Sequence, residues 1–517
     1  MITKSQKNYW ILTAVFILVK ISLHFATSTN YELHRDEMLY FNMADYPAFG
    51  YVSVPPFTGW LAWLIKSAFG YSVWFLRLLP ALAGAVSMYI ISRMVSELGG
   101  KVTSLIIAEL AYLFSPGFLI VNSIFTPNAF EQLFWLLITY FIFKMILENE
   151  PGYWLLIVIL SAFSFLTKYS LVIFIAGIAI AFIFSPYRKM FFSKYLYLSV
   201  LVGVLIIAPN IIWQYSHNWP VFQHFDELKQ TQLVNFKFSH FISEFFGLNL
   251  MASIVWIFGL LSLFFFKEMA KYRFIAIGVL LSMLMFVLFR GKAYYLLGLI
   301  PVMLAFGGYG MEKYLTRRFN LINKAVVILI FTTGIAALPF CLPVLSFDAL
   351  NRYSEKTGNL NIFPFYRWED GKIHPVSQVF ADMTGWEEMV QYVSKSYKML
   401  DKEEQKNCTI FAEENYGYAG AVNFYGKKYN LPAAITFLDN YTLWAPGEIP
   451  AGTFIYINTR LDDIKDLFEN ITLTGSVNNK YFRENGLSVY ICRNPKGNMT
   501  EIYRQLAAQK KQKYSRE

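Results

Sequence analysis

Two adjacent carboxylates, Asp36 and Glu37, stand in an aromatic stretch that follows the first apolar run of the chain. His34 and Arg35 precede them directly, and Tyr40 lies one helical turn beyond Asp36. A carboxylate beside an apolar membrane surface is poorly hydrated, which suits it to remove a proton near neutral pH. These residues therefore indicate a general base with substrate-binding neighbours. An equally open alternative is that the acidic pair caps a short helix in the membrane interface.

Later segments place further polar and aromatic side chains at the ends of apolar runs. Cations at such positions are suited to holding a lipid phosphate, and aromatic rings to stacking on a sugar. Each residue alone also has a structural interpretation as an interfacial anchor or a member of an aromatic belt. Their joint placement on one membrane face favours a substrate-binding site. Its predicted members are Asn128, Glu131, Lys168, Tyr169, His217, Trp219, Arg290, Lys292, Tyr294 and Tyr295.

Two other kinds of candidate carry less weight. The histidines show no pair with ligand spacing such as H-x-x-x-H, so we expect no metal. Lys20 and Glu109 fall inside apolar runs, where ionisable groups are functional candidates by default. Lys20 has a simpler interpretation as a snorkelling side chain, and Glu109 as a hydrogen-bonding partner of a neighbouring helix. We assign neither to the catalytic set.

The composition indicates that a membrane protein positions these side chains. Of 517 residues, 56% are apolar and 15% are charged, whereas soluble domains have about 25% charged residues. The net charge of +10 does not indicate nucleic acid, because residues 346–517 hold 21 basic and 21 acidic side chains. The remaining basic excess is spread between apolar runs. The sequence therefore excludes soluble, disordered and disulfide-scaffold classes, and it predicts membrane lipids as partners.

Apolar stretches close to the roughly 20 residues that cross a bilayer recur through the first two thirds of the chain. Placing the N-terminus in the cytoplasm puts 15 of the 24 Lys and Arg residues before position 346 on the cytoplasmic side. An odd number of spans then sends the C-terminal part outside. We predict 11 spans, at 9–28, 73–95, 102–123, 129–147, 152–167, 169–185, 195–213, 247–266, 274–290, 293–311 and 324–344.

The predicted fold class is thus a polytopic α-helical membrane protein with a C-terminal extracytoplasmic α/β domain. Changes in periodicity within that domain predict helices at 383–400 and 416–429 and strands at 408–414, 453–458 and 487–493. Cys408 and Cys492 lie in two of these strands, where a disulfide and two free thiols are equally compatible with the sequence. The predicted parts are a transmembrane domain (1–345, first outer loop about 29–72), a connector (346–375), the α/β domain (376–495) and a basic, solvated tail (496–517).

The chain resembles the bacterial membrane glycosyltransferases of family 39 type, which are relatives of the protein O-mannosyltransferases and of the lipid A aminoarabinose transferase. The resemblance begins at the acidic pair and continues through later blocks in the expected order. Those blocks are RDEMLYFNMADYPAFGYVSVPPFTGWLAWL, FLRLLPALAGAVS, TPNAFEQLFW, LTKYS, PNIIWQYSHNWPVF, GKAYYLLGLIPVMLAFGG and, in the C-terminal domain, ENYGYAGAVNFYGKKYNLP with DNYTLWAPGE.

The resemblance implies a glycosyltransferase C fold with its active site on the extracytoplasmic side of the bacterial cytoplasmic membrane. It implies a polyprenyl-phosphate sugar as donor, a lipid, glycan or protein hydroxyl as acceptor, transfer with inversion and no cofactor. By similarity, Asp36 is the base that deprotonates the acceptor, and Glu37 orients it or binds the acceptor. Lys168, Arg290 and Lys292 are implied to neutralise the leaving polyprenyl phosphate.

One departure from the family bears on this assignment. Many relatives have Asp where this chain has Asn128, so a second carboxylate role at that position is in doubt. Glu131 lies one helical turn away and is a candidate to substitute for it. A member of the family that has lost activity is therefore one alternative.

Two other classes compete with the enzyme. A transporter or flippase of a lipid-linked sugar accounts for the spans and the lysines, but not for a large exterior domain or an acidic aromatic loop. Transporters also tend to show repeated halves, which this sequence lacks. In a membrane-anchored binding or scaffold protein, replacement of Asp36 leaves the function intact.

Overall fold

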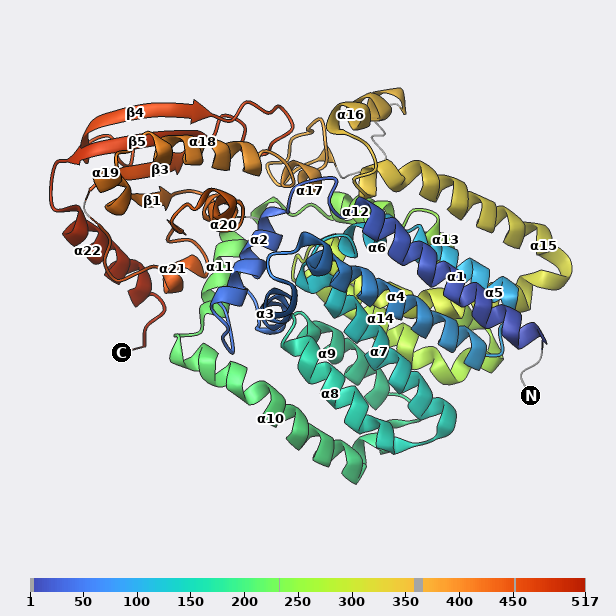
Figure 1. Cartoon of the computed structure of the whole chain (residues 1–517). Helices are drawn as coiled ribbons and strands as arrows, with labels where there is room; N and C mark the ends of the chain where they lie inside the picture. The colour runs from blue at the N-terminus through green and yellow to red at the C-terminus, as the bar shows by residue number, and fades with distance from the viewer. Residues whose placement is uncertain (1–3, 232, 358–365, 451, 517) are drawn as a thin grey trace. The chain divides into compact units, whose positions relative to one another are not determined.

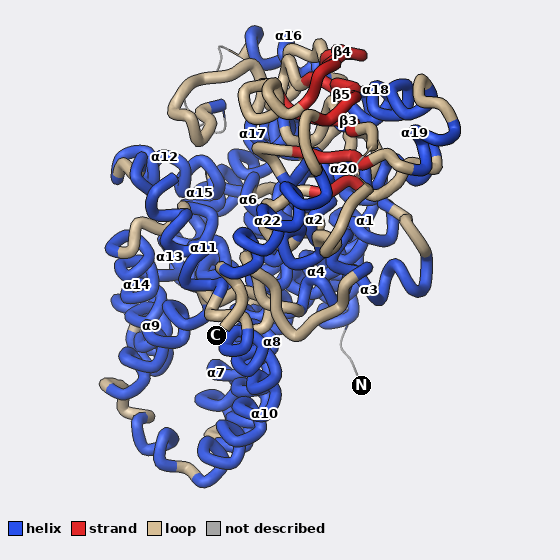
Figure 2. The backbone as a smooth tube through the Cα atoms, turned by 90° about the vertical axis from the view of Figure 1, so that its left-hand side faces the viewer, coloured by secondary structure: helices blue, strands red, loops and turns tan. Residues whose placement is uncertain are grey.

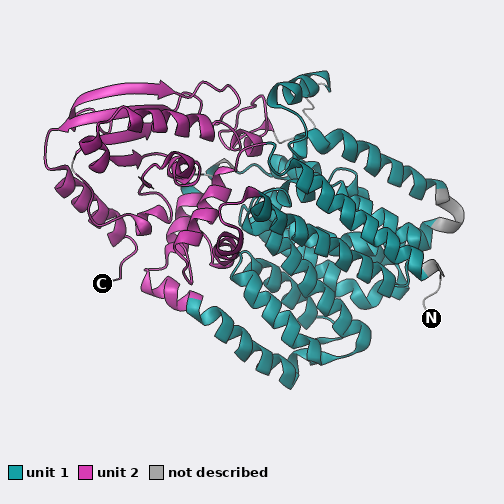
Figure 3. Ribbon diagram, viewed as in Figure 1, with its two compact units in different colours: residues 1–30, 74–209, 229–365 teal, residues 31–73, 210–228, 366–517 magenta. Residues whose placement is uncertain are grey.

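The computed structural model describes residues 4–231, 233–357, 366–450 and 452–516 and contains two compact units (Figure 3). We call Met1–Asn30, Trp74–Pro209 and Lys229–Phe365 the helical unit, and Tyr31–Val73, Asn210–Leu228 and Tyr366–Glu517 the mixed unit. The predicted first outer loop therefore groups with the C-terminal third of the chain. The predicted connector contains α16 (Phe347–Lys356), and its residues 358–365 lie outside the described part.

The helical unit consists of helices that are joined by short turns (Figure 1). Apolar side chains dominate these helices, so most of them have no polar face that requires water. The principal helices are α1 (Lys4–Thr27), α4 (Val73–Glu97), α5 (Val102–Leu113), α6 (Pro116–Val121), α7 (Pro127–Glu148), α8 (Trp154–Phe165), α9 (Leu171–Ile183), α10 (Lys194–Ser216), α12 (Phe238–Asn249), α13 (Ala252–Phe265), α14 (Arg273–Leu288) and α15 (Ile300–Cys341).

Fewer helices are long enough to cross a membrane than the 11 spans that the sequence predicted. Among the described residues, 7 helical stretches are long and apolar enough to cross a bilayer, or 8 if the bent pair α12–α13 forms one span. Two of the 7 stretches, Ala293–Leu315 and Leu321–Cys341, belong largely to α15. Three predicted spans correspond to the shorter apolar helices α5, α8 and α9, which have 12 or 13 residues.

Two predicted spans are interrupted for local reasons. The span predicted at 102–123 breaks between α5 and α6, where Ser115 is extended and Pro116 begins the next helix. A residue before proline is driven out of the helical conformation by the proline ring, so the break lies where the sequence requires it. The span predicted at 247–266 begins later, because Leu250 has a φ of 43° and α12 and α13 meet at a bend of 101°.

A five-stranded sheet forms the centre of the mixed unit (Figure 2). Its strand order is β2-β1-β3-β5-β4, in which β1 pairs in parallel with β2 and β3, and β5 is antiparallel to β3 and β4. The elements are β1 (Thr409–Ala412), β2 (Ala434–Ile435), β3 (Phe454–Asn458), β4 (Phe468–Ser476), β5 (Ser488–Pro495), α2 (Arg35–Asn42), α3 (Phe57–Phe69), α11 (Pro220–Thr231), α17 (Gln378–Ala381), α18 (Trp386–Lys398), α19 (Lys402–Lys406), α20 (Tyr416–Tyr425), the 3₁₀ helix η8 (Gly426–Tyr429), α21 (Tyr441–Trp444) and α22 (Met499–Gln512).

The predicted α/β character of this unit is confirmed, with two omissions and one error. The predicted helices correspond to α18 and to α20 with η8, and the predicted strands to β1, β3 and β5, whereas β2 and β4 were not predicted. The prediction of a solvated tail at 496–517 is wrong. Residues 499–512 form α22, which buries Met499, Tyr503 and Ala507 in the core that covers β3, because these apolar residues recur on one helical face.

The order of the strands also decides whether Cys408 and Cys492 form a disulfide. Cys408 lies directly before β1 and Cys492 lies in β5, and β3 separates these two strands. Strands two positions apart are about 9–10 Å from each other, beyond the span of a disulfide. Both thiols are free and buried.

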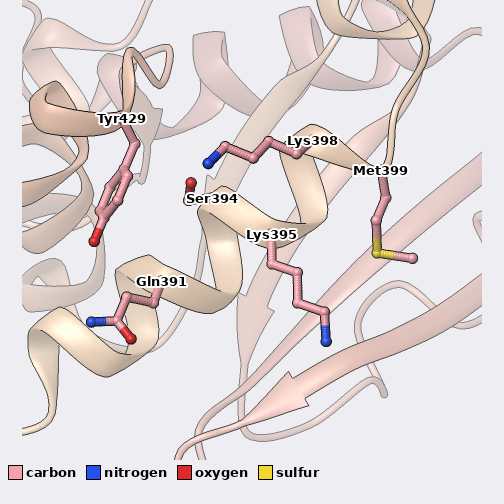
Figure 4. A pocket seen from close by; sticks show the side chains of 6 residues that line it. All are labelled: Gln391, Ser394, Lys395, Lys398, Met399 and Tyr429. Carbon is pink, nitrogen blue, oxygen red and sulfur yellow. The ribbon is translucent and has the colours of Figure 1, made fainter.

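An open groove lies on the surface of the mixed unit, along the exposed side of α18 (Figure 4). The Lys398 ammonium lies 5.8 Å from the centre of the Tyr429 ring at one side of this groove. The groove is lined by Gln391, Ser394, Lys395, Lys398, Met399 and Tyr429.

Candidate active site

The acidic pair lies at the beginning of α2, where the two carboxylates have different environments. His34 is the N-cap residue, and its Nδ1 accepts a hydrogen bond of 3.1 Å from the Asp36 N–H. Glu37 is fully buried and accepts a hydrogen bond of 2.9 Å from the His34 N–H, which completes a capping box. The capping interpretation therefore applies to Glu37, whereas the side chain of Asp36 is left partly exposed.

Tyr416 and Arg35 hold the Asp36 carboxylate from two sides. The Tyr416 hydroxyl, at the start of α20, donates a hydrogen bond of 2.5 Å to Asp36 Oδ1. The Arg35 Nε lies 3.5 Å from the same oxygen and 3.6 Å from Oδ2 of Asp382. Arg35 also lies over the Tyr416 ring, 5.6 Å from its centre. We call His34, Arg35, Asp36, Asp382 and Tyr416 the Asp36 cluster.

Asp382 is the buried counter-ion of this cluster. Besides Arg35, its Oδ2 lies 3.6 Å from His34 Nε2 and 3.1 Å from Arg483 Nη1. Arg483 is held in turn by Glu369, 3.3 Å away. A buried carboxylate is tolerated only where cations and hydrogen bonds compensate it. Asp382 therefore fixes the cations on the inner side of the cluster and leaves Asp36 as its accessible anion.

The electrostatics keep Tyr416 protonated and Arg35 charged. Burial, and then the neighbouring Asp36 charge, raise the pKa of Tyr416 well above its usual value, so the phenol remains a hydrogen-bond donor. Burial by itself would lower the pKa of Arg35, but Tyr416, Asp382 and Asp36 outweigh it and raise that pKa. A permanent donor and a permanent cation beside a carboxylate stabilise its ionised form, which is the form that accepts a proton.

The segment from Asp439 to Trp444 fastens the loop that follows α2. Asn440 Oδ1 accepts a hydrogen bond of 2.7 Å from the Val52 N–H, and the Trp444 ring stacks on Tyr46 with 4.6 Å between centroids. Asp439 itself has a φ of 50°, an uncommon backbone conformation for a residue other than glycine. These contacts all lie within the mixed unit, so the C-terminal residues position the loop that follows α2.

A second tether lies just before the cluster. The Glu32 carboxylate accepts hydrogen bonds of 2.7 Å and 3.2 Å from the Trp386 and Glu387 N–H groups, at the beginning of α18. The carboxylate thereby satisfies donors that a helix N-terminus leaves unpaired. Burial outweighs these hydrogen bonds and raises the pKa of Glu32 to about 7.

The helical unit contains a separate group of predicted site residues around Lys168, at the turn between α8 and α9. Its ammonium donates a hydrogen bond of 2.7 Å to Asn128 Oδ1 and lies 3.3 Å from Glu131 Oε2. The ring of Tyr295 is centred 3.9 Å from the same ammonium, and that of Tyr294 5.2 Å. We call Asn128, Glu131, Lys168, Tyr294 and Tyr295 the Lys168 cluster. Three of the sequence segments that were predicted to meet on one membrane face thus contact one another at Lys168.

Asn128 and Glu131 together provide polar partners for the Lys168 ammonium. Both lie in the first turn and a half of α7, so one helical face presents them together. Glu131 is buried and also accepts a hydrogen bond from Ser170. Because Asn128 is neutral, Glu131 is the one carboxylate that pairs with Lys168 among the residues that the structure describes.

The remaining predicted site residues are not members of the two clusters as defined above. Two of them adjoin a cluster: Tyr40 contributes to the raised pKa of Tyr416, and the Lys292 carbonyl oxygen accepts a hydrogen bond of 3.1 Å from the Tyr295 N–H. The His217 ring stacks on Trp213 of its own helix at 4.1 Å, and its Nδ1 lies 2.8 Å from the Trp213 carbonyl oxygen. Trp219 has a φ of 52° between α10 and α11. Arg290 is exposed with a φ of 55°. The other three lie on α2 (Tyr40), beside Phe165 (Tyr169) and directly before the 3₁₀ helix Ala293–Leu299 (Lys292).

The sequence analysis did not single out three residues of this site: Tyr416, Asp382 and Arg483. Tyr416 lies in the block ENYGYAGAVNFYG, whose resemblance to the family was noted, and its position before a helix was the available signal. Asp382 and Arg483 had no such signal, because only the folded chain brings Asp382 to Arg35 and Arg483 to Asp382. Among the described residues, no group of three or more His, Cys, Asp and Glu is arranged to hold a metal ion.

Comparisons with known proteins agree with this architecture. Residues 53–213 match the family described as dolichyl-phosphate-mannose-protein mannosyltransferase. The structure is similar to ArnT from Cupriavidus metallidurans in the apo state, with 14% identity over 94% of this chain and 98% of ArnT and a TM-score of 0.60. It is also similar to the same protein bound to undecaprenyl phosphate, with 14% identity over 93% and 98% of the two chains and a TM-score of 0.59. No curated protein sequence matched the chain.

The chain thus has the fold of ArnT, and the similarity covers 94% of its length. The predicted resemblance to family 39-type enzymes, related to the O-mannosyltransferases and to ArnT, is confirmed. The predicted fold class is confirmed as well, since the ArnT-like fold covers both the apolar helices and the small C-terminal sheet.

Proposed function

We propose that this protein transfers a sugar from a polyprenyl-phosphate donor to a hydroxyl group of a lipid, glycan or protein acceptor, with inversion at the anomeric carbon. The observation that carries the proposal is the Asp36 carboxylate, partly exposed and held by Tyr416 and Arg35. The family match over residues 53–213 and the binding of undecaprenyl phosphate by the structurally similar ArnT support a lipid-phosphate donor.

In the proposed reaction, Asp36 takes the proton of the acceptor hydroxyl while that oxygen forms a bond to the anomeric carbon. The bond from this carbon to the phosphate oxygen breaks, and polyprenyl phosphate leaves with the electron pair. Tyr416 and Arg35 keep the carboxylate ionised and fix its direction, which makes them positioning residues. Glu37 is buried, so it does not contact the acceptor. Its proposed role is to position Asp36 by capping α2.

We assign the phosphate to the Lys168 cluster. Lys168 is a cation with two tyrosine rings beside it, and within the described part of the chain Glu131 is its one carboxylate partner. Neutralising the charge that develops on the leaving phosphate lowers the barrier to its departure, so no strong general acid is required. Arg290 and Lys292 are proposed as further phosphate contacts, and Tyr40, Tyr169, His217 and Trp219 as substrate contacts. The membrane is proposed to be the bacterial cytoplasmic membrane, with the N-terminus in the cytoplasm and the mixed unit outside.

A donor assay tests this proposal. Purified protein in nanodiscs is incubated with a panel of radiolabelled polyprenyl-phosphate monosaccharides and with candidate acceptors, and release of polyprenyl phosphate is measured. We expect release by the wild type and a loss of about 10²–10⁴-fold in Asp36→Asn, the range for a general base. Asp370→Asn is the matched control, because Asp370 is an exposed carboxylate that pairs with His374.

The other outcomes separate the competing classes. Equal release by Asp36→Asn and the wild type would remove Asp36 as the base. Donor binding without release from any sugar and acceptor of the panel, together with donor movement between leaflets in a flipping assay, would identify a transporter. Acceptor binding that survives in Asp36→Asn, with no release by the wild type, would favour a scaffold.

A further inference from the structure

A pair of lysines in the mixed unit lies apart from the Asp36 cluster. Lys66 belongs to α3, and Lys427 belongs to η8, more than 300 residues later in the chain. Both ammonium groups lie over the ring of Tyr71, at 4.7 Å and 3.5 Å from its centre. Two like charges are thus brought together at one aromatic ring, an arrangement that costs free energy unless an anion offsets it.

One carboxylate partly offsets these charges. Asp45 forms an ion pair with Lys66, and its other oxygen accepts a hydrogen bond of 3.3 Å from the Tyr71 hydroxyl. Within the described ranges, no carboxylate forms an ion pair with Lys427. Lys66, Lys427 and Asp45 together therefore carry a net charge of +1. This charge matches the single negative charge of a phosphodiester.

The pKa values of the two lysines agree with a shortage of negative charge. Burial, and then the charge of Lys427, lower the pKa of Lys66 to about 8. Burial also lowers the pKa of Lys427. An anion bound between the two ammonium groups would favour their charged forms.

The surface beside this pair is apolar. Three large side chains of α3, Trp63, Leu64 and Phe69, are each about half exposed, at 48%, 54% and 50%. A short helix with exposed apolar and aromatic side chains beside cations is typical of one that lies in the membrane interface. The ligand that fits both features has an anionic group and hydrocarbon chains.

We propose that Lys66 and Lys427 bind the phosphodiester headgroup of an anionic membrane phospholipid, whose acyl chains lie against Trp63, Leu64 and Phe69. This site is separate from the proposed sugar transfer and does not depend on it. It would anchor α3, and with it the mixed unit, to the lipid headgroups.

Lipid binding by the purified full-length protein tests the site. Native mass spectrometry during titration with phosphatidylglycerol or phosphatidylcholine counts the bound lipids and gives their affinities. We expect the wild type to hold phosphatidylglycerol at one site at least tenfold more tightly than phosphatidylcholine, and Lys66→Gln/Lys427→Gln to lose that preference. The expected loss of an at least tenfold preference in affinity is about what two charge-assisted contacts contribute to binding. Lys395→Gln/Lys398→Gln, in the groove along α18, is the matched control and should keep the preference.

Further variants and ligands decide among the sources of phosphate. Leu64→Ser/Phe69→Ser keeps both charges, so it should weaken phosphatidylglycerol binding if the ligand is a lipid. Competition by inorganic phosphate at the same site, with no effect of this second variant, would overturn the lipid assignment. Preferential loss of polyprenyl phosphate in the double-lysine variant would also overturn it. Unchanged phosphatidylglycerol affinity in a double-lysine variant with a wild-type thermal midpoint would remove the site altogether.

Discussion

The Asp36 cluster and the Lys168 cluster contain the same kinds of group, a carboxylate, a cation and tyrosine, but they expose opposite charges. In the first, the side chain of Asp36 is 31% exposed, while Arg35 is 17% exposed and its counter-ion Asp382 only 2%. In the second, Lys168 is 18% exposed and Glu131 only 5%. The more exposed member of each ion pair is therefore an anion in one cluster and a cation in the other. Each buried partner fixes the charge that its cluster presents.

This difference divides the proposed chemistry. An accessible carboxylate backed by fixed cations accepts a proton, whereas an accessible ammonium backed by a fixed carboxylate attracts a phosphate. The residue types alone do not show which cluster exposes an anion and which a cation, because both clusters contain acidic, basic and aromatic residues. Variants that change the buried or the accessible member of each cluster therefore test the comparison.

Replacement of the buried anion of the Asp36 cluster should have the largest effect. Asp382→Asn leaves Arg35 and Arg483 without their shared counter-ion, and breaking a buried ion pair from one side costs about 3–5 kcal/mol. We expect a lower thermal unfolding midpoint in detergent and loss of turnover. Glu131→Gln should cost less, because Lys168 keeps its hydrogen bond to Asn128. Equal destabilisation by the two variants would contradict the proposed difference, and Asp370→Asn is the control.

Replacement of the accessible cation comes next. Lys168→Gln removes the charge proposed to hold the donor phosphate, so donor affinity should fall by about 10–100-fold, as expected for one or two charge-assisted hydrogen bonds. Asp36→Asn should bind the donor as the wild type does. Isothermal titration with a non-transferable donor analogue measures both. Lys144→Gln, a lysine of the same unit that pairs with Glu148, serves as the control. A donor affinity that depends on Asp36 and not on Lys168 would reverse the two assignments.

Removal of the tyrosine donor should have a smaller effect. Tyr416→Phe deletes the hydrogen bond to Asp36 that favours the ionised carboxylate, so turnover should fall about tenfold. The acidic limb of the pH–rate profile should move to higher pH by about one unit, since one unit corresponds to about 1.4 kcal/mol. Tyr418 lies on the same helix as Tyr416, and its hydroxyl donates a hydrogen bond to Glu484. The control variant Tyr418→Phe removes that hydrogen bond and should leave the pH–rate profile unchanged. A lower rate without a shifted profile would mean that Tyr416 has only a structural role.

The smallest expected effect concerns the tether at Glu32. Its pKa is raised from 4.5 to about 7, so the folded state binds a proton that the unfolded state has released. Stability from this group is therefore present below about pH 4.5 and is lost as the pH rises through 7. Thermal midpoints measured between pH 5 and pH 8 should fall less steeply in Glu32→Gln than in the wild type. The surface variant Glu403→Gln should follow the wild type, and parallel curves for all three proteins would contradict the assignment.

The sequence by itself determined the class of the protein and the identity of both accessible groups. Apolar runs require a membrane because their side chains cannot be hydrated, and Asp36 and Lys168 stand out as charges at the ends of such runs. Local breaks at Ser115–Pro116 were also encoded by the residues, although the prediction of a continuous span overlooked them.

Only the tertiary structure decided which charge each cluster presents. Asp382 and Tyr416 contact Arg35 and Asp36 from more than 300 positions away, and Arg483 joins them through Asp382. No periodicity in a single segment specifies such contacts. The same holds for Glu37, whose role as a cap depends on how α2 begins, and for α22, whose apolar face is buried only because it packs into the core beside β3. Sequence patterns report which side chains avoid water, whereas the partner of a buried charge is set by the packing of the whole chain.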